Sequence, residues 1–264
     1  MPPFPDQWTD GERYEAYIGR WSRPVARHFV HWLAIPPGHT WLDFGCGSGA
    51  LTHAVLAETD PRAVLACDRA ARYVAHLRDH TPDRRATFDV LELEGLCRVP
   101  PVDVLVSGLV LNFLPDPAAA LEIFRTATKS GGTVAAYVWD YADGMQFLRA
   151  FWDTAVELEP SAAQLDEGTR FPVCRLEPLR CLFHDAGLRD VASADLTVPT
   201  VFRDFEDLWE PFLGGQGPGP SYVQGLSFEH RDTLRQRLMK RLAPVRGESI
   251  ALTARAWAVR GIAA

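Results

Sequence analysis

One short segment restricts the fold of this chain more than any other, because in it a buried strand runs directly into glycines. The residues Leu42-Asp43-Phe44-Gly45-Cys46-Gly47-Ser48-Gly49 close an apolar stretch that starts at Thr40, and a helical pattern begins at Ala50. Glycine adopts backbone angles that are closed to other residues and lets a ligand approach the main chain. The following helix points its N-terminus at such a ligand. The segment therefore predicts a strand, a tight ligand-binding turn and a helix.

Strand-like and helix-like stretches alternate from the N-terminal region to Trp139. Such alternation predicts right-handed crossovers and a mostly parallel sheet, whose ligands bind at the carboxyl ends of the strands. Gly131 and Gly132 are expected to separate the last helix from the last strand of this series. The predicted strands are 40–44, 63–67, 86–91, 102–107 and 133–139, and the predicted helices are 24–33, 50–58, 70–79 and 116–128, with Asp116 as a cap.

The pattern changes after Tyr141. Two further strands, 191–201 and 249–259, are expected to add an antiparallel hairpin at the sheet edge, with helices inserted between them. The fold class expected is thus α/β, a Rossmann-like, mostly parallel seven-stranded sheet with helices on both faces, plus helical cap insertions. The helices expected here are 145–158, 176–186 (closed by Gly187), 205–213 and 229–242, and GGQGPGP at 214–220 is expected to be a turn-rich linker.

The glycine turn by itself fits more than one ligand. Gly45, Gly47 and Ala50 satisfy the dinucleotide pattern G-x-G-x-x-G/A. Asp68, at the end of the second strand, suits either a dinucleotide or an adenosyl group, because a carboxylate there accepts from two ribose hydroxyls. A tight turn without a ligand is the third interpretation.

Three features favour a cationic methyl donor, S-adenosylmethionine, over a dinucleotide. Asp43 lies inside the strand, where a carboxylate repels a pyrophosphate but suits a sulfonium ion with an amino group. Gly49 adds a third glycine to the turn. Asp89, near the end of the third strand, is placed to accept from an adenine amino group.

Charge and composition argue against several other classes of protein. The formal net charge is −7 and there is no tract rich in Lys and Arg, so a nucleic-acid partner is not expected. No apolar run is long enough to cross a bilayer, and the N-terminus does not resemble a signal peptide. The five cysteines, odd in number and without a CxxC pair, predict free thiols in a reducing cytoplasm and no metal site.

At this point the motifs resemble a known family, the class I S-adenosylmethionine-dependent methyltransferases, in the small-molecule branch near the ubiquinone/menaquinone-type enzymes. The order and spacing match across Thr40 to Asp140, and one departure is Asn112, a position that is often histidine in that branch. The matching segments are LDFGCGSG at 42–49, LACDRA at 65–70, TFDVLEL at 87–93, VDVLVSGLVLNFLPDP at 102–117, KSGGTVAAYVWD at 129–140 and, for the N-terminal helix that covers the donor, YEAYIGRWSRPVA at 14–26.

The resemblance implies a single methyltransferase domain that uses S-adenosylmethionine. Its parts would be an N-terminal helical cover at 1–36, a donor-binding core at 37–140 and cap insertions at 141–175 and 202–247. The residues expected to bind the donor are Tyr14, Arg23, Asp43, Gly45, Cys46, Gly47, Gly49, Asp68, Arg69, Asp89, Val90 and Ser107.

The methyl acceptor is expected to be a small, partly apolar molecule held by the insertions. Asp140, Tyr141 and Asn112 follow strand ends and are candidates for contacting it, although turn or cap roles explain each of them equally well. Whether oxygen, nitrogen or carbon is methylated stays open, and a homodimer is compatible with the sequence. The alternatives are an NAD(P)-dependent oxidoreductase and a non-catalytic binding protein of the same fold.

Overall fold

The computed structural model describes residues 15–214, 217–242 and 248–264. The chain forms two compact units, and each unit is made of three separate stretches of the sequence. Unit 1 takes Met1–Trp21, Trp139–Pro172 and Thr197–Arg255, and unit 2 takes Ser22–Val138, Val173–Leu196 and Ala256–Ala264. The predicted insertion 202–247 falls within unit 1 and the predicted insertion 141–175 mostly does, while their role as a cap on a single domain stays a prediction.

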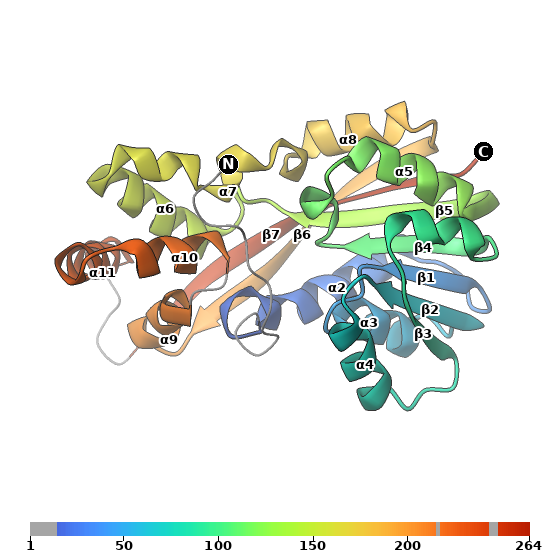
Figure 1. The fold of residues 1–264 in the computed structure, drawn as a ribbon, viewed down its shortest axis with the longest axis horizontal. Coiled ribbons are helices and arrows are strands. Elements are labelled where there is room, and N and C mark those ends of the chain that lie inside the picture. Colours follow the sequence, from blue (N-terminus) through green and yellow to red (C-terminus); the bar gives the residue numbers. More distant parts are fainter. Residues whose placement is uncertain (1–14, 215–216, 243–247) are drawn as a thin grey trace. The chain divides into compact units, whose positions relative to one another are not determined.

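Seven strands form one mixed sheet in the order β3-β2-β1-β4-β5-β7-β6 (Figure 1). The first five are parallel, whereas β7 runs antiparallel to β5, because Gly131 donates to the carbonyl of Ala263 and Asp140 donates to that of Arg255. The predicted mostly parallel sheet with an antiparallel edge pair is confirmed. The strands are β1 Thr40–Phe44, β2 Ala63–Asp68, β3 Ala86–Val90, β4 Val102–Gly108, β5 Thr128–Trp139, β6 Arg189–Phe202 and β7 Ile250–Ile262.

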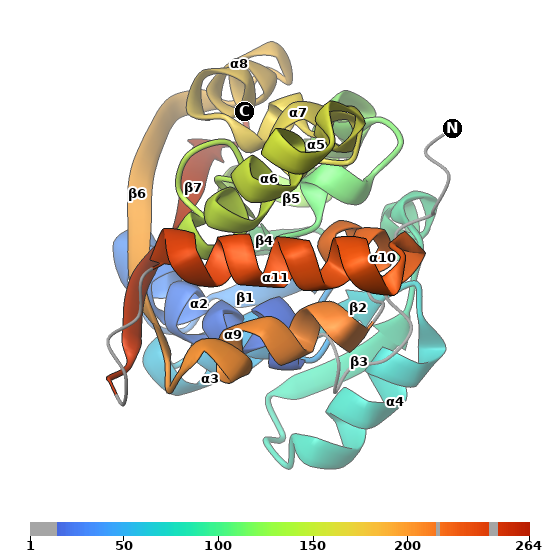
Figure 2. The ribbon, with the colours of Figure 1, turned by 90° about the vertical axis from the view of Figure 1, so that its left-hand side faces the viewer.

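In unit 2, helices cover both faces of the sheet. Figures 1 and 2 agree in placing α5 and α8 on one face and α2, α3 and α4 on the other. The strands between them are almost wholly apolar, and aromatic pairs such as Phe29–Tyr137 (4.7 Å between centroids) and Phe44–Phe124 (5.1 Å) join helix to strand. These helices are α2 Arg20–Leu33, α3 Ala50–Glu58, α4 Ala71–His80, α5 Pro117–Thr126 and α8 Leu176–Asp185.

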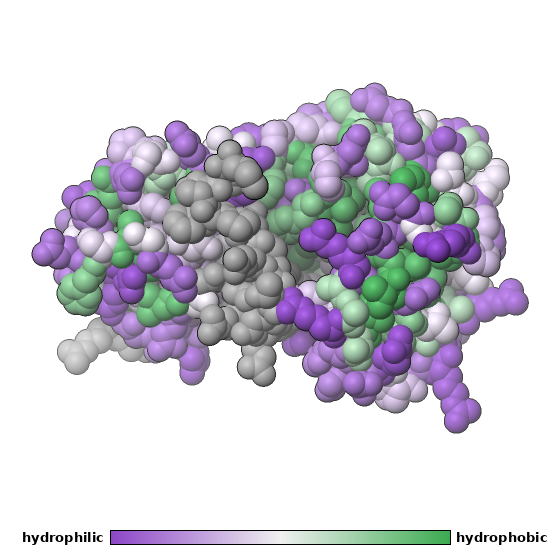
Figure 3. Space-filling view, viewed as in Figure 1, coloured by the Kyte–Doolittle hydropathy of each residue, from purple (hydrophilic) through white to green (hydrophobic). Residues whose placement is uncertain are grey.

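Unit 1 has a core of aromatic side chains. Phe151 stacks on Phe212 at 4.2 Å, and Arg241 pairs with Asp153 and Glu157, which ties α11 to α6. Hydrophilic residues alternate with apolar patches over the molecular face drawn in Figure 3. The helices of this unit are α6 Gln146–Leu158, α7 Glu167–Arg170, α9 Phe205–Trp209, α10 Pro218–Gly225 and α11 Phe228–Leu242.

Short helical turns connect these elements in both units. They contain three to six residues each, and short turns of this kind are frequent as connectors. They are η1 Glu15–Gly19, η2 Leu93–Arg98, η3 Leu111–Phe113, η4 Pro160–Gln164, η5 Pro172–Cys174 and η6 Glu210–Gly214.

Two of the predicted helix ends are confirmed in detail. The carboxylate of Asp116 accepts from the backbone N–H groups of Ala118 and Ala119, both at 3.0 Å, so it caps α5 as expected. Gly187 follows α8 with φ of +76°, the left-handed conformation that ends a helix.

The expected break at Gly131 and Gly132 is wrong. Both glycines lie inside β5, which starts at Thr128. The pairing with β4 jumps from Val102↔Thr128 to Val104↔Thr133, so extra residues of β5 bulge out, and Gly131 has φ of +78° there. The glycines therefore absorb a bulge rather than separate two elements.

Three helix boundaries also differ from the prediction, each at a proline. α2 starts at Arg20 rather than near Pro24, because a proline that early in a helix removes only the first internal hydrogen bond. The helix expected over 205–213 changes to a 3-10 turn at Glu210, since Pro211 has no N–H to donate. The expected linker is wrong for Pro218 to Pro220, which form the first turn of α10, where proline is tolerated; residues 215–216 lie outside the described residues.

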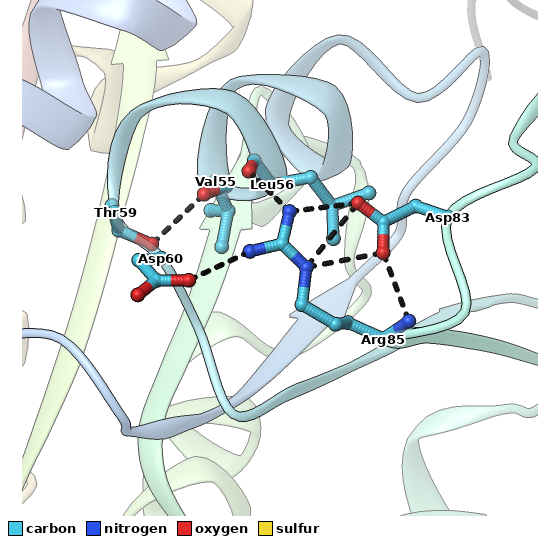
Figure 4. Close-up of polar contacts among 6 residues, drawn as sticks. All are labelled: Val55, Leu56, Thr59, Asp60, Asp83 and Arg85. Carbon is cyan, nitrogen blue, oxygen red and sulfur yellow. Dashed lines mark hydrogen bonds and ion pairs between the residues drawn. The ribbon is translucent and has the colours of Figure 1, made fainter.

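Arg85 connects the end of α3 to the start of β3 (Figure 4). Its Nη2 donates to the carbonyl of Leu56 at 2.9 Å, which satisfies one of the orphan carbonyls at the end of α3. Nη2 also lies 2.7 Å from Asp83, and Nη1 lies 3.0 Å from Asp60. Hydrogen bonds from Arg85 lower the pKa of Asp83 to about 2.

Replacing Asp83 with Asn should destabilise the chain at neutral pH, and the effect should fade in acid. The Asp83 carboxyl ionises at about pH 2 in the folded chain and at about pH 4 in an unfolded one. Its stabilising contribution is therefore present above about pH 4 and is lost as the pH falls through about 2. The measurement is the midpoint of thermal unfolding for wild type and Asp83→Asn across that range. The control is Asp79→Asn, which removes an exposed carboxylate from α4. A difference in unfolding midpoint between wild type and Asp83→Asn that does not change with pH would contradict the prediction.

Candidate functional site

The glycine turn after β1 is attached by its backbone to the end of β2. The N–H groups of Gly45 and Cys46 both donate to the carbonyl of Cys67, at 2.8 and 2.9 Å. The next N–H along the chain, that of Gly47, donates to the carboxylate of Asp68 at 3.0 Å. These three bonds fix the turn at the carboxyl edge of the sheet, where ligands of parallel sheets bind.

Each of the three glycines in the turn has a positive φ, but their surroundings differ. A Cβ on Gly45 would lie 2.5 Å from Val110, and one on Gly49 would lie 2.2 Å from Leu77, so these two glycines allow close packing. A Cβ on Gly47, whose φ is +50°, would meet no atom of the described residues within 4 Å. The backbone at Gly47 is thus open, as the close approach of a ligand requires.

Asp43 is a buried carboxyl group with one oxygen unused. It is 1% exposed, and its Oδ2 accepts from the Thr52 hydroxyl at 2.6 Å. Its Oδ1 is buried and has no hydrogen-bond partner in the described part of the chain. Burial, aided by the charge of Asp68 and opposed by the Thr52 hydrogen bond, raises the pKa of Asp43 to about 7. An oxygen of this kind suits a cationic ligand group, which would pair with it and favour its ionised form.

The acidic residues at the ends of β2 and β3 lie beside each other. Asp68 is half-buried, and while its Oδ2 accepts from Gly47 of the glycine turn, its Oδ1 accepts from the N–H of Ala70 at 2.8 Å. It pairs with Val90 in the parallel register, and Cys67 pairs with Asp89. Asp89 is exposed and accepts from the N–H of Val90, and Val90 is 47% exposed. A carboxylate and an open apolar side chain therefore flank the turn on the side of β3.

Other residues predicted to bind the donor are engaged in holding the protein together. Ser107 is fully buried and donates to the carbonyl of Phe44 at 2.9 Å, which links β4 to β1. Cys46 is buried, and burial raises the pKa of its thiol far above the ordinary range. Arg69 is exposed beside Asp68. Among the described residues, no group of His, Cys, Asp and Glu is arranged to hold a metal ion.

Asn112 lies just beyond the end of β4, after a strained residue. It is 8% exposed, and its Nδ2 is buried with no partner in the part of the chain that the structure describes. Leu109, three residues earlier, has φ of +62°, which is unfavourable for a branched side chain and is found at sites where function requires it. Asn112 is thus the candidate with a free donor at the sheet's carboxyl edge.

The N-terminal candidates are only partly described. Tyr14 lies outside the described residues. Arg23 is exposed on α2. Burial lowers the pKa of His53, and the charges of Arg23 and His76 lower it further. This electrostatic effect places Arg23 near α3.

In unit 1, Asp140 is occupied by an ion pair. Its side chain is 2% exposed and lies 2.5 Å from Nη2 and 2.9 Å from Nε of Arg255. Its Oδ1 also accepts from the N–H of Asp143 at 3.1 Å, so the carboxylate closes the turn after β5. Tyr141 is buried against Phe171, with 6.0 Å between ring centroids. These contacts favour the turn and packing roles.

The sequence did not reveal several side chains that contact the candidate residues of the two units. Thr52 was not singled out, although a hydroxyl one turn into the helix after a glycine turn is well placed to reach an acid in the preceding strand. Val110 fills the space that Gly45 leaves, and Arg255 is paired with Asp140 over a separation of 115 residues. No local signal predicts the last of these.

Known proteins resemble this chain over parts of different length. A model of the methyltransferase domain matches residues 42–134. A 2-methyl-6-phytyl-1,4-hydroquinone methyltransferase of Synechocystis is 27% identical over 80% of this chain and 73% of its own length. A trans-aconitate 2-methyltransferase of Methylobacterium nodulans is 27% identical over half of each chain. Among solved structures, a phosphoethanolamine N-methyltransferase of Haemonchus contortus in complex with S-adenosyl-L-methionine has a TM-score of 0.55 at 15% identity, covering 95% of this chain and 56% of that one.

The chain is a class I S-adenosylmethionine-dependent methyltransferase. The likeness to the solved structure shows the fold alone, whereas the sequence relatives are methyltransferases by name. The residues of this methyltransferase fit its donor, since the turn offers an open backbone at Gly47 and an unused buried carboxylate oxygen at Asp43. No helix in the described ranges has the length and apolar character needed to cross a bilayer.

Replacing Gly47 with Ala should weaken donor binding with little further loss of stability. The substitution is strained by the positive φ, but the added methyl group meets no protein atom, so it would occupy the space into which a ligand approaches. We expect the Kd for S-adenosylhomocysteine, measured by calorimetry, to rise about tenfold or more.

Gly187→Ala is the matched control for this substitution. Gly187 also has a positive φ, of +76°, with no atom within 4 Å of an added Cβ, but it lies after α8 rather than in the turn. The two variants should therefore lose similar stability, while only Gly47→Ala loses affinity. Equal affinities for S-adenosylhomocysteine would show that the donor does not approach Gly47.

Proposed function

We propose that this methyltransferase methylates a small, partly apolar molecule in the cytoplasm, without a nucleic-acid or membrane partner. The supporting observation is the extent of the match to the hydroquinone methyltransferase. That alignment spans 237 residues, more than twice the 104 positions of the core predicted at 37–140, so it includes segments beyond the donor-binding motifs. A net charge of −7 without a basic tract also disfavours a polyanionic acceptor.

We also propose a role for each donor-binding residue. Asp43 receives the amino group of the donor, and the backbone at Gly47 faces the donor's chain. Asp68 accepts from the ribose hydroxyls, because each of its oxygens accepts one hydrogen bond within the described part of the chain and carboxylate oxygens have further lone pairs. Asp89 and Val90 contact the adenine. Tyr14, Arg23 and Arg69 stay predictions from the family resemblance, as does a homodimer.

Positioning explains the catalysis without a general base. When bound, S-adenosylmethionine supplies a methyl group on a good leaving group, so alignment of the reacting atoms is the main task of the protein. Asn112 would orient the acceptor through its unused N–H group. Asp140 is not available to the acceptor, because Arg255 and the N–H of Asp143 already occupy its carboxylate oxygens. A non-catalytic binding protein with this fold remains the alternative, and it would bind the donor without turnover.

A labelling experiment tests the proposed acceptor class. The chain is incubated with S-adenosylmethionine carrying a radioactive methyl group and a desalted cell lysate supplemented with the small-molecule fraction. We expect the label in products that extract into organic solvent, with S-adenosylhomocysteine formed in equal amount. Label in acid-precipitable protein or nucleic acid would overturn the small-molecule assignment, and donor binding without S-adenosylhomocysteine would indicate a non-catalytic protein.

The affinity for S-adenosylhomocysteine should rise with pH until Asp43 is ionised. Because the carboxyl has a pKa of about 7, it is largely protonated at about pH 6, and binding an ammonium group there requires a proton to leave. Kd should therefore fall by up to about tenfold per pH unit from about pH 5.5 to 7 and then level off. Calorimetry in buffers of different ionisation enthalpy counts the released proton directly.

Asp43→Asn is the control for this pH dependence. It keeps the side chain's size and its bond with Thr52 but cannot ionise, so its Kd should be higher and flat across the range. His53 is another titratable group near the turn, and its pKa is lowered, mainly by burial. The same pH profile in wild type and Asp43→Asn would assign the titration to another group.

A further inference from the structure

Arg20 lies against two aromatic rings in unit 1. Its Cζ is 4.6 Å from the ring centroid of Trp21 and 4.6 Å from that of Phe202. The centroids of the two rings are 5.7 Å apart and the rings are inclined at 71°. The cation–π contacts with both rings restrict the position of the guanidinium group.

One corner of this guanidinium is paired. Nη1 donates to Oδ1 of Asp207 at 3.2 Å. Asp207 also accepts from the N–H of Arg203 at 3.0 Å and from its Nη2 at 3.3 Å. Burial by itself raises the pKa of Asp207, but the hydrogen bonds from Arg203 and the charge of Arg20 outweigh it and lower the pKa. Asp207 is therefore an ionised, shared partner that reaches only Nη1 of Arg20.

The opposite edge of the guanidinium has no partner. Nε and Nη2 of Arg20 are both buried and make no hydrogen bond in the described part of the chain. A buried, unpaired donor costs about 1–3 kcal/mol, and more when the group is charged. Two such atoms on one arginine therefore indicate a ligand, because Nε and Nη2 form the pair of parallel donors that a carboxylate binds in a bidentate manner.

The surroundings select the kind of anion. Asp207 already neutralises much of the charge of Arg20, which favours a single negative charge over a phosphate dianion. Phe202 also packs against Phe147 at 5.7 Å, so apolar rings adjoin the guanidinium. Thr200, two residues before Phe202 on the same strand face, is fully buried, and its hydroxyl also has no partner among the described residues. An apolar molecule with one carboxylate fits this set of groups.

We propose that the Nε and Nη2 edge of Arg20 binds the carboxylate group of a small, partly apolar molecule. The groups that form this ligand site all belong to unit 1. Since protein atoms cover both nitrogens, neighbouring side chains must move aside when the carboxylate enters.

The test uses benzoate as a probe and benzamide as its neutral counterpart of the same shape. Both are titrated at millimolar concentration into the full chain saturated with S-adenosylhomocysteine, and binding is followed by calorimetry. Benzoate should bind at least about tenfold more tightly than benzamide, the usual size of a charge-assisted pair. Arg20→Lys, which keeps the charge but loses the two-donor edge, should remove most of this preference, and Arg20→Gln should remove all of it.

Arg203→Gln is the matched control, because it removes the other arginine bound to Asp207 and leaves the free edge of Arg20 intact. It should keep the preference for benzoate. Should the Arg20 variants fail to fold, the arginine side-chain NMR spectrum of the wild-type chain decides, since benzoate must shift one Nε–H resonance downfield and benzamide must not. Equal binding of the two probes, or no such shift, overturns the inference. Failure of the wild-type chain to bind S-adenosylhomocysteine would instead count against the donor site on which the proposed function depends.

Discussion

The site depends on the bond between the glycine turn and the end of β2. In a parallel sheet the carboxyl ends of the strands meet at one edge, but the loops there are free to point elsewhere. The carbonyl of Cys67 accepts two turn N–H groups and Asp68 accepts a third, so the turn and the acidic strand end form one rigid piece. Both partners come from consecutive residues of β2. The position of the glycine turn is therefore set by its neighbouring strand, through two backbone hydrogen bonds and the side chain of Asp68.

This arrangement carries an electrostatic cost. Asp43 is fully buried, and both this burial and the charge of Asp68 oppose its ionisation and raise its pKa. Burying an unpaired charge is unfavourable, so the carboxyl stays partly protonated near neutral pH unless a cation pairs with it. Thr52 offsets part of this cost by donating to one oxygen and leaving the other for the ligand. The same residues that destabilise the empty turn thereby favour a cationic donor over a pyrophosphate.

The sequence predicted the sheet and the donor turn well, because both arise from local patterns. Apolar runs, glycines and the cap at Asp116 act within a few residues, and these predictions are confirmed. Local patterns do not reveal contacts with distant partners. The bulge at Gly131, where a break was expected, depends on pairing with β4 and β7. The bond of Asp140 with Arg255, a residue on the last strand, and the bond of Ser107 with Phe44 have no local signal either, and the predicted roles of both residues stay predictions.

The aromatic residues of unit 1 show how to separate packing from recognition. Phe147, Phe151 and Phe212 are fully buried against one another, as core residues are. Apolar side chains satisfy each other, so their presence does not indicate what is bound. Polar atoms must find specific partners, and a buried one without any is costly enough to require an explanation. In both units such atoms, on Asp43 and Asn112 in one and on Arg20 in the other, are therefore more informative about ligands than the aromatic clusters.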